Sequence, residues 1–297
     1  MGVQPFTLVL VSAVTHAYWN FILKRSGGSP TFVALSKVGE VVLFAPVFLA
    51  ATLRGTVDLR ALGGFAPVGA LLVVGNYALL AAAYRRGELS LVYPVSRGGV
   101  LLFLPVMGWL VARERVSAAG CAAFALILGG IGSLHLPSLD LRSLAGLGAR
   151  LRSPSVPYAL AAALTAACYT LWDKRAVQAL PAFAYFYAYT TLAALALGAA
   201  VLGRRPRGEV LREWRSHRGA ILQVGFFNTV TYLLVLAALR GGTSSYVVAV
   251  RQLSIAVGVF LGWLLLEEAV GAPKVAGVVL VLLGCALISF TPAPVPS

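Results

Sequence analysis

Two arginines lie inside stretches of sequence that are otherwise apolar. Arg97 lies near the middle of 89–111, and Arg251 is the eighth residue of 244–266. An ionisable side chain at the centre of a membrane-length apolar segment costs about 2.5–3.5 kcal/mol on insertion scales. Arginine keeps its charge in any protein environment and can hold a carboxylate or phosphate through two hydrogen bonds. We therefore expect an anion-binding pair. The alternative is that helix carbonyls or a nearby glutamate satisfy each arginine.

Lys37 and Glu40 form a second ionisable pair, within the apolar stretch 31–53. Residues three apart share a face of a helix, so the ammonium and the carboxylate can pair directly. Glu40 is the best candidate for a proton carrier, because burial raises the proton affinity of a carboxyl and a neighbouring lysine lowers it. The alternative is an internal ion pair that only fixes helix packing.

Uncharged polar side chains follow the same apolar stretches. His16 and Asn20 are four residues apart on one face of 5–23, with Trp19 beside them. Such residues can contact a substrate, or they can form hydrogen bonds between helices, which are common in membranes. The complete set that we expect to bind a substrate is Arg97, Arg251, Lys37, Glu40, His16, Asn20, Trp19, Tyr93, Asn76, Asn228 and Tyr232.

The sequence lacks the motifs of catalysis and of metal binding. There is no HExxH, no GxSxG and no paired-aspartate motif, and the three aspartates, Asp58, Asp140 and Asp173, all lie near the ends of apolar stretches. We therefore expect no catalytic residues, no metal and no cofactor. An intramembrane enzyme and a structural or regulatory membrane subunit remain as alternatives to a transporter.

Long apolar segments must position all of these residues. The chain has 297 residues, of which 59% are hydrophobic and 11% charged. Runs of about 18 or more apolar residues predict membrane-spanning helices. We predict ten spans, at 5–23, 31–53, 65–84, 89–111, 117–136, 156–173, 181–203, 219–239, 244–266 and 273–291. The fold class is therefore an all-α integral membrane protein. Between the spans, 204–218 is expected to be a basic loop.

The net charge of +14 comes from basic residues in the short gaps between spans. This pattern is typical of loops that face the cytoplasm and contact anionic lipid headgroups, so the expected partner is a lipid bilayer and not a nucleic acid. Counted over the loops, the charges place both termini outside the cytoplasm.

An internal repeat organises the spans. The segments 86–116 and 240–270 align without a gap and share nine of thirty-one residues, and Lys24 corresponds to Lys174 in the same frame. Two halves of five spans each must enter the membrane from opposite sides, which is a common plan among secondary transporters. We expect halves at 1–136 and 156–291, joined by a linker at 137–155.

Each copy of the repeat ends in a glutamate. We expect Glu114 and Glu268 to lie in interfacial water and to pair with Arg113, Arg115 or Lys274. Gly258 and Gly262 form a GxxxG motif, which permits close contact between helices, within one chain or across a homodimer.

The ten spans, the RGxxS entries at 86–90 and 240–244, and the glutamates 114 and 268 resemble the EamA-like family of the drug/metabolite transporter superfamily. The resemblance covers nearly the whole chain. It implies two inverted repeats, a small-molecule substrate, export by alternating access, coupling to a proton or a counter-substrate, and the bacterial cytoplasmic (inner) membrane. It also implies termini inside the cytoplasm, in contrast to the charge count.

Overall fold

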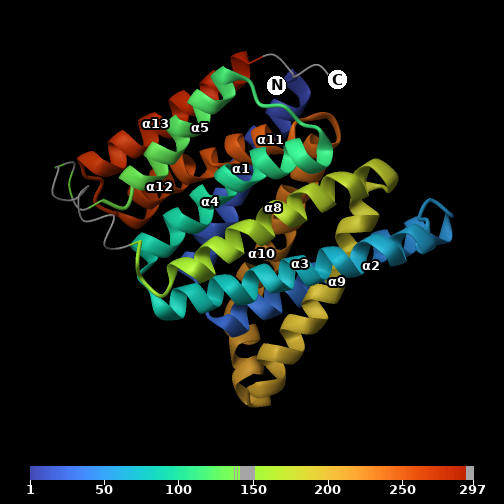
Figure 1. Cartoon of the computed structure of the whole chain (residues 1–297). Coiled ribbons are helices and arrows are strands. Elements are labelled where there is room, and N and C mark those ends of the chain that lie inside the picture. Colours follow the sequence, from blue (N-terminus) through green and yellow to red (C-terminus); the bar gives the residue numbers. More distant parts are fainter. Residues whose placement is uncertain (137, 139, 141–150, 292–297) are drawn as a thin grey trace.

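The computed structural model describes residues 1–136, 138, 140 and 151–291, so most of the predicted linker lies outside the described residues. The described part contains only helices and connecting segments (Figure 1). The helices of the first half are α1 (Val3–Arg25), α2 (Pro30–Leu53), α3 (Leu59–Arg86), α4 (Leu89–Ala112) and α5 (Ala118–Ser133). Those of the second half are α8 (Val156–Ala179), α9 (Ala182–Val201), the 3₁₀ turn η1 (Leu202–Arg204), α10 (Arg207–Gly241), α11 (Ser244–Arg251), α12 (Leu253–Leu266) and α13 (Ala272–Phe290).

Eight spans, α1–α4, α9, α10, α11–α12 and α13, are long and apolar enough to cross a membrane, and α5 is a shorter apolar helix. Together with α8, which has 24 residues, they give the expected all-helical, multi-span membrane protein. Side chains cap the N-termini of α2, α3 and α5. Ser29 and Ser117, for example, accept hydrogen bonds from backbone N–H groups in the first turns of α2 and α5.

One expectation about a single element is wrong, and one predicted span, confirmed as Ser244–Leu266, contains an interruption. The predicted basic loop 204–218 is mostly helical, because α10 begins at Arg207 and runs for 35 residues. No proline follows Pro206 in this segment, and Glu209 pairs with Arg205 one turn away. The predicted span 244–266 is not one continuous helix, because it is interrupted at Gln252, directly after Arg251.

The ends of α4 and α12 have the same geometry at corresponding positions of the repeat. Arg113 and Glu267 both adopt the left-handed conformation, with φ 55°. In each case the next residue turns back, so that the N–H of Glu114 donates to Gly108 and that of Glu268 to Gly262. This turn directs each glutamate toward the bundle instead of toward solvent.

Glycines allow two pairs of helices to touch backbone to backbone. A Cβ atom at Gly225 of α10 would lie 2.9 Å from the carbonyl oxygen of Ser36 and 3.0 Å from the amide nitrogen of Glu40, both in α2. A Cβ atom at Gly130 of α5 would lie 2.7 Å from the carbonyl oxygen of Gly277 in α13. Figure 1 shows α5 and α13 side by side at one edge of the bundle.

Candidate functional site

A cavity of about 150 Å³ lies in the middle of the bundle. Its walls come from α1, α2, α3, α4, α8, α9, α10 and α11. Eight of the eleven residues predicted to bind a substrate line it: His16, Trp19, Lys37, Asn76, Arg97, Asn228, Tyr232 and Arg251. The sequence positions of these residues span most of the chain, so the fold brings them together from both halves.

The two arginines face this cavity without a counter-ion. The guanidinium carbon of Arg97 lies 5.6 Å from the centre of the Tyr93 ring, and that of Arg251 lies 5.7 Å from the centre of the Tyr232 ring. In the described part of the chain no carboxylate oxygen lies within 4.0 Å of either guanidinium. Cation–π contact leaves the N–H donors of a guanidinium available, so both can bind an anion.

His16 and Trp19, which line the cavity, each carry a polar atom without a partner in the described part of the chain. Their rings meet edge to face with centroids 4.9 Å apart. Nδ1 of His16 and Nε1 of Trp19 are buried and make no hydrogen bond within the chain. Buried polar atoms in native proteins nearly always have partners, so an unsatisfied pair at a cavity indicates a ligand or water there.

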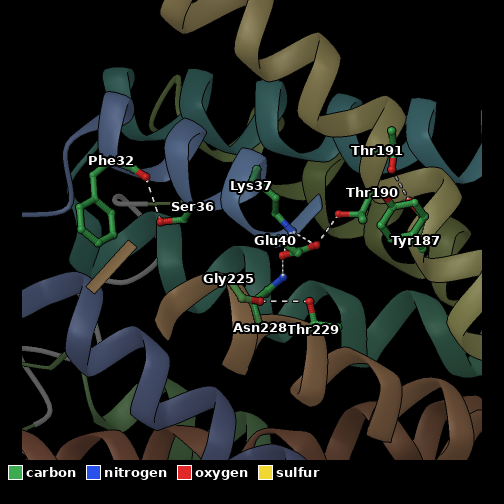
Figure 2. Close-up of polar contacts among 10 residues, drawn as sticks. All are labelled: Phe32, Ser36, Lys37, Glu40, Tyr187, Thr190, Thr191, Gly225, Asn228 and Thr229. Carbon is green, nitrogen blue, oxygen red and sulfur yellow. Dashed lines mark hydrogen bonds and ion pairs between the residues drawn. The ribbon is translucent and has the colours of Figure 1, made fainter. Parts of the chain in front are cut away.

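Glu40 is buried, with 1% exposure, and is not part of the cavity wall. Figure 2 shows its carboxylate at the centre of a closed network that joins α2, α9 and α10. Nζ of Lys37 lies 3.1 Å from Oε2, Thr190 donates to Oε1 at 2.6 Å, and Asn228 donates to Oε2 at 2.7 Å. These are the contacts of an internal ion pair that fixes helix packing. Lys37 and Asn228 belong to this network and also line the cavity.

The other predicted residues are placed around the cavity. The amide of Asn76 donates to the carbonyl oxygen of Ala162 at 2.6 Å and so ties α3 to α8. The amide of Asn20 donates to the carbonyl oxygen of His16 in its own helix. Asn20 and Tyr93 lie outside the central cavity and line the larger space described next.

A vestibule of about 490 Å³ lies beside the cavity and shares His16 and Arg97 with it. We use the name for the space lined at its inner end by His16 and Arg97 and at its outer end by Lys24 and Glu268. Gly258 and Gly262, the predicted GxxxG contact, lie in its wall, so this face of α12 points into the chain. A polar ligand in the vestibule can therefore meet Arg97.

Lys24 pairs with Glu268 at the mouth of the vestibule, so Glu268 does not pair with Lys274 as expected. Both side chains are partly exposed, at 64% and 35%. The hydrogen bond from Lys24 lowers the pKa of the Glu268 carboxyl. A lowered pKa means that this ion pair is fully formed above the ordinary glutamate range and is lost only as the pH falls through the lowered value.

A second lysine–glutamate pair closes the opposite end of the bundle. Leu89, at the start of α4, lines the vestibule. Glu114 follows the end of the same helix, which has 24 residues and is therefore about 36 Å long. Glu114 accepts from Nζ of Lys174 at 2.5 Å and from both the N–H and the hydroxyl of Ser244. Its side chain is only 8% exposed, so the expected pairing in interfacial water is wrong. Its contacts with Lys174 and Ser244 bury it, whereas Glu268, after the same kind of turn, stays partly exposed.

A depression of about 500 Å³ on this second surface ends at the Lys174–Glu114 contact. The residues of the central cavity are not among those that line it. The cavity therefore shares lining residues with the vestibule and none with this depression.

Asp173 is the residue that the sequence reasoning missed. We expected it near a span end, but its side chain is fully buried, with 0% exposure. Its carboxylate accepts from the hydroxyls of Tyr185 at 2.6 Å and of Tyr232 at 2.5 Å. Its spacing of four residues from Tyr169, which lines the cavity, was the available signal that it faces the bundle interior.

The EamA-like transporter family matches residues 153–290, which include α8–α13. No curated protein matches the chain. One solved structure, described only as the crystal structure of a protein, is similar over 96% of this chain and 97% of its own length, with a TM-score of 0.73 and 15% identity. At this identity the similarity shows the fold alone. The apolar helices indicate an integral multi-pass membrane protein, and its second half is similar to the EamA-like transporter family.

Proposed function

We propose that the protein is a secondary transporter of a small anionic or zwitterionic metabolite. The observation that carries this proposal is the pair of guanidiniums, Arg97 and Arg251, that face one central cavity without a carboxylate partner. The unsatisfied nitrogens of His16 and Trp19 add a donor or acceptor at the same cavity. A charged pair inside a membrane bundle is costly, and a polar ligand of opposite charge offsets that cost.

We also propose that two inverted halves alternate around this cavity, because the contacts exchange between the halves. In the frame of the sequence repeat, α1 corresponds to α8 and α3 to α10. The packing of α1 on α10 is matched by that of α8 on α3, and the packing of α2 on α10 by that of α9 on α3. Lys24–Glu268 and Lys174–Glu114 exchange in the same way. This supports a pseudo-twofold axis through the cavity.

The two lysine–glutamate pairs support alternating access. They occupy corresponding positions at opposite ends of the bundle, yet one is partly exposed beside the vestibule and the other is nearly buried beside the second depression. In an alternating mechanism the halves would interchange these environments. We infer that the buried Lys174–Glu114–Ser244 contact keeps the second surface closed in this conformation.

Glu114→Gln is expected to loosen the closed end. The variant removes a charged acceptor from Ser244 and Lys174, and hydrogen bonds to charged groups contribute about 1.5–3 kcal/mol each. Backbone amide exchange in the first turns of α11 should then become about 10- to 100-fold faster in proteoliposomes, measured by hydrogen–deuterium exchange mass spectrometry. The matched control is Glu268→Gln, whose exposed pair contributes only about 0–1 kcal/mol. Equal exchange in the two variants would contradict this role for Glu114.

A ligand screen on the purified protein tests the proposed substrate class. Thermal unfolding would be followed in detergent against carboxylates, phosphonates, amino acids, sugars and lipophilic cations. A ligand at 100 times its dissociation constant stabilises the folded state by about 2.7 kcal/mol. We expect shifts from anionic or zwitterionic compounds. Shifts from lipophilic cations alone would overturn the anion site, and the absence of any shift would favour a protein without transport activity.

A further inference from the structure

Asp173 is a buried acid without a basic partner. Its two carboxylate oxygens are held by tyrosine hydroxyls, Tyr185 from α9 and Tyr232 from α10. No lysine or arginine nitrogen of the described chain lies within 4.0 Å of them. The two other acids buried in the bundle differ in this respect, because Glu40 is paired with Lys37 and Glu114 with Lys174. A buried carboxylate without a cation is the kind that most readily takes up a proton.

The surroundings of Asp173 contain few charges. The titratable and charged side chains that face this region are Tyr77 from α3, Arg97 from α4, Tyr169 and Lys174 from α8 itself, Tyr185 and Tyr189 from α9, Tyr232 from α10 and Arg251 from α11. Lys174 is engaged by Glu114. Arg251 is the cation linked to Asp173 through a shared partner, because it lies over the ring of Tyr232.

We propose that Asp173 is a proton-binding site and that its proton and the anion bind cooperatively; this proposal rests on the proposed anion transport. The proton comes from water in the vestibule and cavity and forms an O–H bond with one carboxylate oxygen. Ionised Asp173 offsets the positive potential of Arg251 through the contact with Tyr232. Protonation removes that negative charge, so Arg251 then attracts an anion more strongly. The effect is reciprocal, since a bound anion must strengthen proton binding equally.

The position of Asp173 links the cavity with the closed end. Tyr232, which lines the cavity, donates to the carboxylate, and the next residue, Lys174, holds Glu114. A change in charge at Asp173 therefore acts directly on Tyr232, which is part of the cavity wall. It also occurs next to Lys174, which is part of the closing contact. When a proton and an anion are transported together, a proton gradient directed inward favours uptake of the anion. The family resemblance implies export instead.

Infrared difference spectroscopy of the reconstituted full chain tests the proton site without a substrate. We expect acidification to about pH 6, which is above the ordinary range of exposed carboxyls, to produce a protonated-carboxyl C=O band in the wild type and in Glu40→Gln, and no such band in Asp173→Asn. In Tyr232→Phe, which keeps the carboxyl but removes one donor to the carboxylate, the band should form at higher pH. This variant keeps the test informative if Asp173→Asn does not fold. A band that persists in a folded Asp173→Asn, or that is lost in Glu40→Gln, would overturn the assignment.

The coupling is tested with methanesulfonate, whose charge is constant over this pH range. We expect its binding to the wild type, measured by calorimetric titration, to strengthen on acidification by about tenfold, and its binding to Asp173→Asn to be independent of pH. Equal pH dependence in both proteins would overturn the coupling. If methanesulfonate binds neither protein at any pH, the proposed anion site and the coupling both fail, while the infrared band still decides whether Asp173 binds a proton.

Discussion

Arg97→Gln is expected to weaken binding of an anionic ligand by about 100-fold or more. Truncating one partner of a desolvated, hydrogen-bonded charge pair costs about 2–5 kcal/mol, and each 1.4 kcal/mol is a factor of ten in affinity. Because Arg251 faces the same cavity, Arg251→Gln should cause a loss of similar size. Calorimetric titration with the anions that stabilise the wild type in the thermal screen measures both effects.

Two controls make this result specific. Arg97→Lys keeps the charge but loses the two-pronged donor geometry, so its affinity should fall between those of the wild type and Arg97→Gln. Arg60→Gln removes an exposed arginine at the start of α3 and should leave affinity unchanged. If Arg97→Gln binds anions as tightly as the wild type does, the arginine is satisfied within the protein and the anion site is wrong.

The second large effect is expected on folding, from Glu40→Ala. This variant leaves the ammonium of Lys37 and the donors of Thr190 and Asn228 without their shared acceptor, inside the bundle. Removing one partner of a buried ion pair costs about 3–5 kcal/mol. We expect the melting temperature in detergent to fall by about 10 °C, since a chain of this size loses about 2–4 °C per kcal/mol.

The double variant Lys37→Met with Glu40→Met separates charge from packing. Replacing a buried ion pair by apolar residues of similar volume is often nearly neutral, so the double variant should melt well above Glu40→Ala. Glu268→Ala, which breaks the exposed pair with Lys24, is the matched control and should have little effect. A double variant that is no more stable than Glu40→Ala would mean that the cost arises from lost volume and not from the unpaired charge.

The sequence predicts the helical spans and the cavity residues better than it predicts their partners. Arg97 and Arg251 stand out because a charge inside an apolar span has few explanations, and both line the cavity. The same reasoning cannot decide whether Glu40 meets substrate or Lys37, because both outcomes need the same residue types at the same spacing. That choice depends on Thr190 and Asn228, which come from helices about 150 and 188 residues away.

Two features depend on backbone geometry that residue types do not reveal. Glu114 is directed back toward its helix by the left-handed turn at Arg113, and the sequence has no glycine or asparagine at that position to indicate the turn. Its burial also needs Lys174 and Ser244, which come from distant helices. The interruption at Gln252 has no proline or glycine to mark it. Asp173 was placed near a span end because the predicted span 156–173 stops at the first charged residues, whereas α8 continues to Ala179.

The backbone contact between α5 and α13 has a mechanical consequence. These helices correspond to each other in the repeat, and the close approach at Gly130 and Gly277 leaves no space for one to slide past the other. Their residues are absent from the walls of the central cavity. In the proposed alternating mechanism, this tight contact, remote from the cavity, would be the fixed axis about which the two halves rock. Flexibility in this protein would then be greatest where the helices are farthest from that axis.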